Sequence, residues 1–187
     1  MGRGPLAGPV IACAVILPPN FSHPTLNDSK QLSPALREEI CAELKQRPDV
    51  FWAIGIVEHT EIDRFNITGA TYMAMLRAVQ GLAEIPDFLL IDGRPVPAFS
   101  RLKQIALIKG DSRSFSIAAA SVIAKVSRDR IMDGHHKTWP CYQFKNHKGY
   151  ATTEHLEALA KFGPCPIHRT SFLPVRSLNK TQELGFS

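Results

Sequence analysis

The strongest single candidate for chemistry in this chain is Asp92. It follows the apolar run at residues 88–91 and precedes Gly93. We therefore expect its carboxylate at the carboxyl end of a buried strand, the edge along which open α/β sheets place their ligand sites. A turn-forming Asp-Gly pair explains the same residues equally well, so the local pattern leaves both interpretations open.

A second carboxylate, Asp129, lies late in a stretch that predicts a long helix. Spacing of four places Ser121, Lys125, Asp129 and Asp133 on one side of that helix. An exposed ion pair between Lys125 and Asp129 accounts for this spacing and contributes little stability. The local pattern therefore favours a structural role for Asp129 and leaves a functional one open.

The first residues of the chain form an unusual turn sequence, Gly2, Arg3 and Gly4, followed by an apolar run. Such a turn brings bare backbone amides and a guanidinium close to one point, which suits a phosphate or a sugar hydroxyl. The segment is typical of the exit of a strand, although no strand precedes it here.

Basic and aromatic residues are concentrated later in the chain. Between residues 125 and 148 there are six Lys or Arg against two acids. The aromatic residues among or beside them are Trp139, Tyr142, Phe144 and Tyr150. Basic side chains hold phosphates while a ring stacks on a base or sugar, but a solvated face above core aromatics fits equally. His135, His136 and His147 lack ligand spacing, so we expect them at the surface or facing phosphate. Lys30 and Lys109 sit in short polar turns that suit either a phosphate contact or an ordinary loop.

Alternating strands and helices must position these residues. Apolar runs predict strands at 9–17, 51–57, 88–91 and 104–108, and periodic segments predict helices at 34–47, 60–81, 115–134 and 153–162. Ser33 and Pro34 are typical of a helix start, and Thr60 with Asp63 resembles a capping box. We expect an α/β fold with one mixed sheet, and an irregular tail from Pro164 on the surface.

Composition limits the class of protein without deciding it. The 187 residues are 44% hydrophobic and 21% charged, which predicts a folded chain with a real core. The 22 Lys and Arg outnumber the 17 Asp and Glu, a balance that permits a polyanionic partner. The four isolated cysteines predict neither a zinc site nor a disulfide framework. No apolar run is long enough for a membrane span, and no leader is evident, so we expect a cytoplasmic protein.

Taken together, these stretches resemble bacterial ribonuclease HII. The matching pieces run in family order over nearly the whole chain, which makes the set far more specific than any one piece. They are GRGPLAGPV at 2–10, DSKQL at 28–32, NI at 66–67 with AT at 70–71, IDG at 91–93, KGD at 109–111, SIAAAS at 116–121, AKV at 124–126 with RD at 128–129, HKGY at 147–150, and HR with SF at 168–172.

The resemblance implies a ribonuclease H-like mixed sheet flanked by helices (residues 1–137) and a C-terminal helical extension with its tail (138–187). It implies cleavage of RNA in RNA–DNA hybrids and on the 5′ side of ribonucleotides embedded in duplex DNA. It also implies four carboxylates around two Mg²⁺ or Mn²⁺ ions, of which Asp92 and Asp129 match two, as catalytic residues and metal ligands. We expect a monomer.

Substrate recognition also follows from the resemblance. Gly2, Arg3 and Gly4 match the turn that senses the ribose 2′-hydroxyl, and Tyr150 matches a tyrosine that stacks on the adjoining deoxyribose. Lys30 and the basic residues of 125–148 are then expected to hold the duplex backbone.

The chain departs from the family at its start, where Asp-Glu and one small residue should precede the Gly-Arg-Gly turn. The first two carboxylates and the first central strand are therefore expected to be missing, which predicts little activity from these 187 residues. Either the natural start lies upstream, or the chain is a remnant that binds RNA–DNA hybrids or junctions without cutting. We favour the first explanation, because the surroundings of Asp92 and Asp129 match the family.

Overall fold

The computed structural model describes residues 1–26, 29 and 31–178. Two compact units divide the chain. Unit 1 comprises Met1, Ile11–Ile56 and Thr71–Val126, and unit 2 comprises Gly2–Val10, Val57–Ala70 and Ser127–Ser187. Each unit is described by itself below. The predicted division at residue 137 is a different one, and it stays a prediction.

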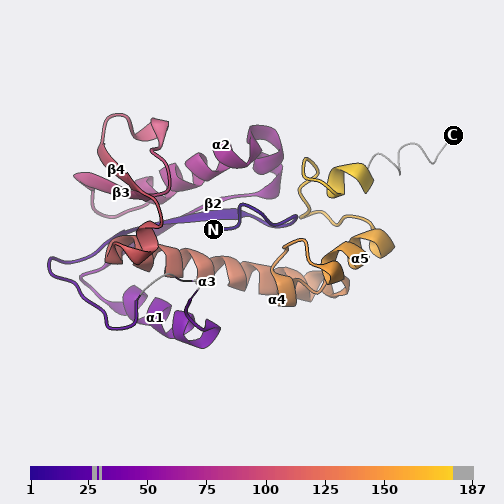
Figure 1. Ribbon diagram of the computed structural model, residues 1–187, viewed down its shortest axis with the longest axis horizontal. Helices are drawn as coiled ribbons and strands as arrows, with labels where there is room; N and C mark the ends of the chain where they lie inside the picture. Colours follow the sequence, from indigo (N-terminus) through magenta and orange to yellow (C-terminus); the bar gives the residue numbers. More distant parts are fainter. Residues whose placement is uncertain (27–28, 30, 179–187) are drawn as a thin grey trace. The chain divides into compact units, whose positions relative to one another are not determined.

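The strands form two pairs. β1 (Val10–Ile16) pairs with β2 (Phe51–Val57), and in unit 1 β3 (Phe88–Asp92) pairs with β4 (Lys103–Leu107). β3 and β4 are parallel and lie side by side (Figure 1), with Phe88 beside Lys103 and Asp92 beside Leu107. All four predicted strands are thus present. The described strands form two separate two-stranded sheets where we expected one mixed sheet, and the absence of a central strand stays a prediction.

Helix α1 (Pro34–Gln46) begins as its sequence predicts. Ser33 Oγ accepts a hydrogen bond from the Leu36 amide at 3.2 Å, and Pro34 occupies the first turn, where its missing N–H costs nothing. Ile40, Cys41 and Leu44 are the buried residues of this helix. They join the buried apolar residues of the first half of α3 (Phe115–Thr138) in the main core of unit 1.

Helix α2 (His59–Gln80) is kinked at Asn66, whose φ of 57° and ψ of 169° are not helical. The Asn66 side-chain oxygen accepts from the amides of Thr68 and Gly69 at 2.9 and 3.1 Å, so it caps the segment that follows the kink. The predicted capping box of Thr60 and Asp63 was wrong, because the Asp63 carboxylate bonds to Thr170 and Ser171 and not to the start of the helix. The Glu58 amide instead donates to the Glu61 carboxylate at 3.3 Å.

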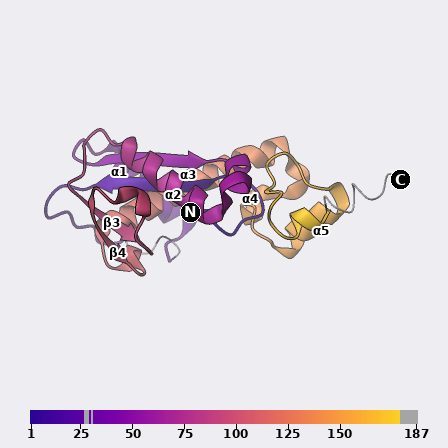
Figure 2. The ribbon, with the colours of Figure 1, turned by 90° about the horizontal axis from the view of Figure 1, so that it is seen from above.

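Unit 2 contains the last half of α3, the short helix α4 (Phe144–His147) and α5 (Thr153–Phe162), with α4 and α5 visible in Figure 2. Single 3-10 turns at Pro97–Phe99, Gly110–Ser112 and Pro140–Tyr142 complete the elements. The core of unit 2 consists of Leu6, Ala7, Met132, Tyr142, Phe144, Ala158, Leu159, Cys165, Ile167 and Val175.

The tail after Pro164 differs from the expectation of a surface segment. Ile167, His168 and Arg169 are buried, and Val175 is fully enclosed. Ala7 and His168 form an antiparallel bridge, so the start of unit 2 and its tail lie against one another. The tail is not irregular throughout, because residues 175–178 are helical after Pro174. Its apolar side chains Ile167 and Val175 enter the core of unit 2. None of the helices in the described part of the chain has the length and apolar character needed to span a lipid bilayer.

Candidate functional site

Gly2 can only be glycine in this structure. Its φ of +82° lies in the left-handed region, and a Cβ there would stand 2.2 Å from Arg128 Nε and 2.8 Å from the Pro9 carbonyl oxygen. Gly2 is buried, while Arg3 and Gly4 are exposed. The turn therefore keeps one glycine against the protein and presents the Arg3 side chain to solvent.

Arg128 supports this turn from α3. Its side chain is only 2% exposed. Nε donates to the Pro9 carbonyl at 3.0 Å and Nη2 donates to the Ala7 carbonyl at 3.1 Å. Nη1 donates to the Lys148 carbonyl at 2.9 Å. Burial lowers the pKa of Arg128. Because three of its N–H groups are bonded to main-chain carbonyls and the residue is buried, we do not expect Arg128 among the phosphate-holding residues of 125–148.

Arg169 supports the same turn from the tail and is completely buried. Its Nε and Nη2 donate to the Gly8 carbonyl at 3.0 and 2.8 Å. Nη2 also donates to the Gly2 carbonyl at 2.7 Å, and Nη1 donates to the Arg3 carbonyl at 3.1 Å. Sequence reasoning gave this residue no role, although it lies within a family-matching piece.

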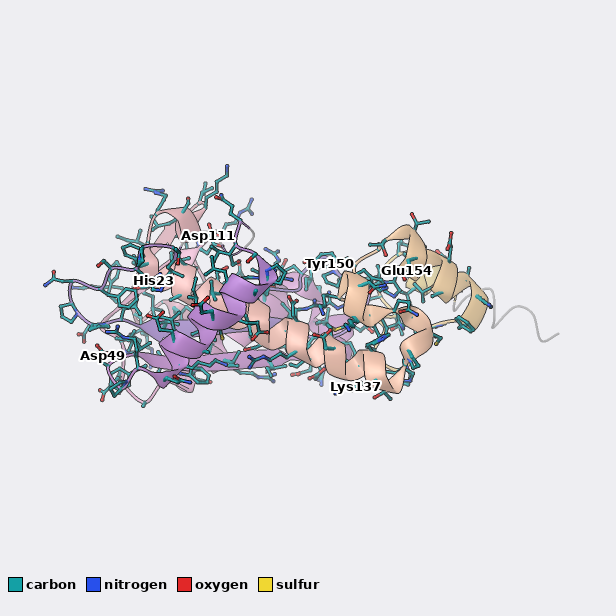
Figure 3. All side chains as sticks on the ribbon, turned by 90° about the horizontal axis from the view of Figure 1, so that it is seen from below. His23, Asp49, Asp111, Lys137, Tyr150 and Glu154 are labelled. Atoms are coloured by element: carbon teal, nitrogen blue, oxygen red, sulfur yellow. The ribbon has the colours of Figure 1, made fainter. Side chains whose placement is uncertain are left out.

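Tyr150 lies beside the Gly-Arg-Gly turn. A Cβ placed on Gly4 would be 3.6 Å from Cε1 of the Tyr150 ring, and the ring is 43% exposed. The Leu6 amide donates to the Gly149 carbonyl at 2.7 Å, which ties the two segments together. Tyr150 follows α4 and precedes α5 in the chain, and Figure 3 labels it together with Glu154, which belongs to the first turn of α5. The predicted turn and the predicted stacking tyrosine are thus neighbours within unit 2.

Two other residues of the basic stretch differ from expectation. Lys148 forms an ion pair with Asp133. His147 is buried, and both of its ring nitrogens are hydrogen-bonded to the main chain. Nε2 donates to the Tyr142 carbonyl at 2.7 Å, and Nδ1 accepts from the Gly149 amide at 3.1 Å. His147 is therefore an interior residue of unit 2. Its bond to the Gly149 amide helps to hold the segment that carries Tyr150.

Asp92 ends β3 in unit 1, as the sequence predicts. Its side chain is exposed, and Oδ1 accepts a hydrogen bond from the Gly110 amide at 3.0 Å. Gly110 follows β4, so the carboxylate joins the carboxyl ends of the two parallel strands. The strand that carries Asp92 is half-buried, because Leu89 and Ile91 face the core while Leu90 is exposed.

Asp129 belongs to the part of α3 that lies in unit 2, and its side chain is half-buried. Asp92 belongs to unit 1. Lys30 lies outside the described residues. Carboxylate oxygens suit Mg²⁺ and Mn²⁺. However, the described residues contain no group of three or more acidic, histidine or cysteine side chains placed to hold a metal, so they do not make a complete metal centre.

Asp63 is a further structural residue that sequence reasoning misassigned. Its Oδ2 accepts from the amide and hydroxyl of Thr170, both at 2.8 Å. Its Oδ1 accepts from the amide and hydroxyl of Ser171 at 3.0 and 2.5 Å. Partial burial opposes the charge, but hydrogen bonds from Ser171 and Thr170 outweigh it and lower the pKa of Asp63. Asp63 thus fixes the residues that follow Arg169.

A buried histidine pair fixes the residue before Arg169. His155 Nε2 lies 3.0 Å from His168 Nε2. Because the Cys165 amide donates to His168 Nδ1 and the Tyr150 carbonyl accepts from His155 Nδ1, both rings are neutral and His168 donates to His155. Burial lowers the pKa of each ring to about 4, and in His168 the neighbouring His155 adds to this effect.

Comparison with known proteins assigns the chain to a family. The family model for ribonuclease HII matches residues 1–175. A ribonuclease HII of Syntrophomonas wolfei is 50% identical over 177 residues, which are 95% of this chain and 69% of that protein. A ribonuclease HII of Bacillus subtilis is 51% identical over the same length, 95% of this chain and 68% of that protein.

A solved structure supports the fold. The crystal structure of the ribonuclease H2 from Pyrococcus horikoshii OT3 superposes with a TM-score of 0.77, covering 98% of this chain and 95% of that one, at 24% identity. The expected ribonuclease H-like α/β fold is thereby confirmed. The expected ribonuclease H-type hydrolysis and binding of RNA–DNA hybrids follow from the family model and from the half-identical relatives. The chain therefore belongs to the ribonuclease HII family.

Proposed function

We propose that this protein cleaves the RNA strand of RNA–DNA hybrids and cuts on the 5′ side of single ribonucleotides embedded in duplex DNA. The observation that carries the proposal is the Gly-Arg-Gly turn set beside the exposed ring of Tyr150 in unit 2. A guanidinium and a turn can meet a 2′-hydroxyl, and an adjacent ring can stack on the next sugar. The remnant that binds without cutting is not our proposal, since relatives half-identical to this chain are named ribonucleases.

The residue roles follow from this arrangement. We assign Gly2, Arg3 and Gly4 to the ribose 2′-hydroxyl and Tyr150 to the neighbouring deoxyribose. Lys30 is assigned to the duplex backbone. Because Arg128 and Lys148 are committed to protein groups, the phosphate contacts fall to other basic residues of 125–148. Such contacts make binding dependent on salt.

Asp92 and Asp129 are proposed as catalytic carboxylates and as ligands of Mg²⁺ or Mn²⁺. A solved crystal structure of Bst-RNase HIII is a complex with Mn²⁺, which supports a divalent metal in this fold. Two carboxylates are fewer than the four that the proposed two-ion site needs. We therefore propose that Asp92 and Asp129 support little turnover without further carboxylates beside them.

A nicking assay tests the proposal. The substrate is an end-labelled DNA duplex with one ribonucleotide, and the control is the same duplex with deoxyribose at that position. With Mg²⁺ or Mn²⁺, we expect a form that carries a strand and an Asp-Glu pair ahead of Met1 to nick only the first duplex, on the 5′ side of the ribonucleotide. We expect Asp92→Asn or Asp129→Asn to abolish this nicking.

Two outcomes contradict the proposal in different ways. Junction binding without any nicking by the extended form supports a binding-only protein. Ordinary turnover by the 187 residues shows that the argument from two missing carboxylates is wrong. We also propose a cytoplasmic monomer, and size-exclusion chromatography with light scattering tests the second part of that statement.

A further inference from the structure

Arg169 is a buried cation, and no carboxylate of the described residues forms an ion pair with it, although the charge of Asp63 is near enough to act against the lowering of its pKa. Its charge is surrounded by the carbonyls of Gly2, Arg3 and Gly8. Burial and the nearby charge of Arg128 lower the pKa of Arg169. Burying this guanidinium costs free energy, because the charge loses its hydration, and an apolar side chain would fill the same space without that cost. Its retention needs a reason other than core packing.

The shape of the guanidinium supplies that reason. Its donors lie in one rigid plane, and here three of its nitrogens reach three carbonyl groups of one short segment. A lysine has all its donors on one atom and cannot span the same carbonyls. The four hydrogen bonds therefore set the path of residues 2–8 to a degree that no other side chain reproduces.

The backbone of Arg169 is itself fixed from both sides. Its amide donates to the Leu6 carbonyl at 2.8 Å. His168, the residue before it, bonds to His155, and Thr170, the residue after it, bonds to Asp63. The guanidinium therefore projects from a rigid support into the turn.

We propose that Arg169 is a positioning residue for ribonucleotide recognition. It holds the carbonyls of Gly2 and Arg3 toward the protein, so that the exposed Arg3 side chain leaves the turn at a fixed place and Gly4 stays beside Tyr150. This inference rests on the proposed function, since it concerns the same turn. It adds a residue that touches no substrate and acts only through the turn.

Binding without metal tests this role separately from cleavage. The affinities of the 187-residue chain are measured by fluorescence anisotropy in EDTA, for a duplex with one ribonucleotide and for its all-DNA counterpart. For Arg169→Lys, we expect the ratio of the two affinities to fall about tenfold, with the all-DNA affinity unchanged. The matched control, Arg176→Lys, changes an exposed arginine of the same tail and should leave the ratio unchanged.

A double-variant cycle separates positioning from general stability. If Arg169 acts through the turn, Arg3→Ala lowers the ratio in the wild-type chain and has no further effect in Arg169→Lys. Equal losses of affinity for both duplexes, or fully additive effects of the two substitutions, overturn the inference.

The remaining outcomes are also decisive. A wild-type chain without ribonucleotide preference overturns the proposed function and this inference with it, whereas a preference that Arg169→Lys leaves intact overturns the inference alone. If Arg169→Lys shows no cooperative thermal transition, Arg169→Gln, which keeps a side-chain amide, takes its place with the same measurements. If neither variant folds, Arg169 is a folding residue and the positioning role is rejected.

Discussion

At the scale of single residues, the site depends on which arginines are buried. Arg3 is exposed, whereas Arg128 and Arg169 are enclosed and bonded to main-chain carbonyls. All three lie in pieces that match the family, so their sequence context does not separate them. The exposed one is suited to a ligand, and the two buried ones are suited to holding the loop that carries it.

Replacement of Gly2 by alanine tests the close contact between the turn and Arg128. The new Cβ would stand 2.2 Å from Arg128 Nε at a backbone conformation that alanine adopts poorly. We expect the free energy of unfolding to fall by about 1–3 kcal/mol, together with a loss of ribonucleotide preference. Urea denaturation gives the first value, and anisotropy gives the second.

Gly134→Ala is the matched control, because a Cβ at that helical position meets nothing within 4 Å. It should leave stability unchanged or raise it by up to about 1 kcal/mol. Equal losses from both alanine substitutions would mean that the contact with Arg128 does not restrict position 2.

At the scale of elements, the first half of α2 and the tail are joined by Asp63. One carboxylate receives four hydrogen bonds from Thr170 and Ser171, across more than a hundred residues of sequence. The helix thereby holds the segment from which Arg169 reaches the turn. An aspartate near a helix start resembles a capping residue in sequence, and only the fold shows that it binds a distant loop.

Asp63→Ala should remove this connection. We expect a loss of about 1–3 kcal/mol in the free energy of unfolding at pH 7, because amide and hydroxyl donors lose a charged acceptor. Since the pKa of Asp63 is lowered in the folded state, its contribution is present above its ordinary pKa and is lost as the pH falls through the folded value.

Denaturant titrations at several pH values below 5 check this sign, because the difference between wild type and Asp63→Ala should shrink there. Asp49→Ala serves as the control, since Asp49 pairs with Arg47 at an exposed site and should matter little. A difference that persists undiminished at low pH would contradict the role of the ionised carboxylate.

At the scale of the whole molecule, stability should depend on pH through the buried histidine pair. The pKa values of His155 and His168 are lowered to about 4, so their neutral forms favour the folded state. Their contribution is full above the ordinary histidine pKa of 6.5 and is lost as the pH falls from 6.5 toward 4. We expect the free energy of unfolding to fall by a few kcal/mol over this range.

Urea denaturation at several pH values between 7.5 and 4.5 measures how steeply the free energy of unfolding changes with pH. His155→Asn should flatten this dependence, even if the variant is less stable at every pH. His23→Asn removes a histidine that contacts the exposed Glu43, outside the buried pair. This variant should keep the wild-type dependence of unfolding free energy on pH. A wild-type stability that does not vary between these pH values would contradict the neutral assignment of the pair.

The amino-acid sequence by itself determined most elements and the position of Asp92. Apolar runs gave the four strands nearly to their bounds, and Ser33 with Pro34 gave the start of α1. These features are local, because a side chain a few residues away decides them. The family-matching pieces also led directly to ribonuclease HII, which the comparisons confirmed.

Only the tertiary structure decided which charged residues are buried. Arg128 and Arg169 donate hydrogen bonds to carbonyls more than a hundred residues away, and Asp63 accepts hydrogen bonds from Thr170 and Ser171 across a similar separation. A sequence pattern predicts a charged residue at the surface, because burying a charge costs free energy unless polar groups surround it. Whether such groups converge on it depends on the fold, so no local pattern could have shown that Arg169 supports the Gly-Arg-Gly turn.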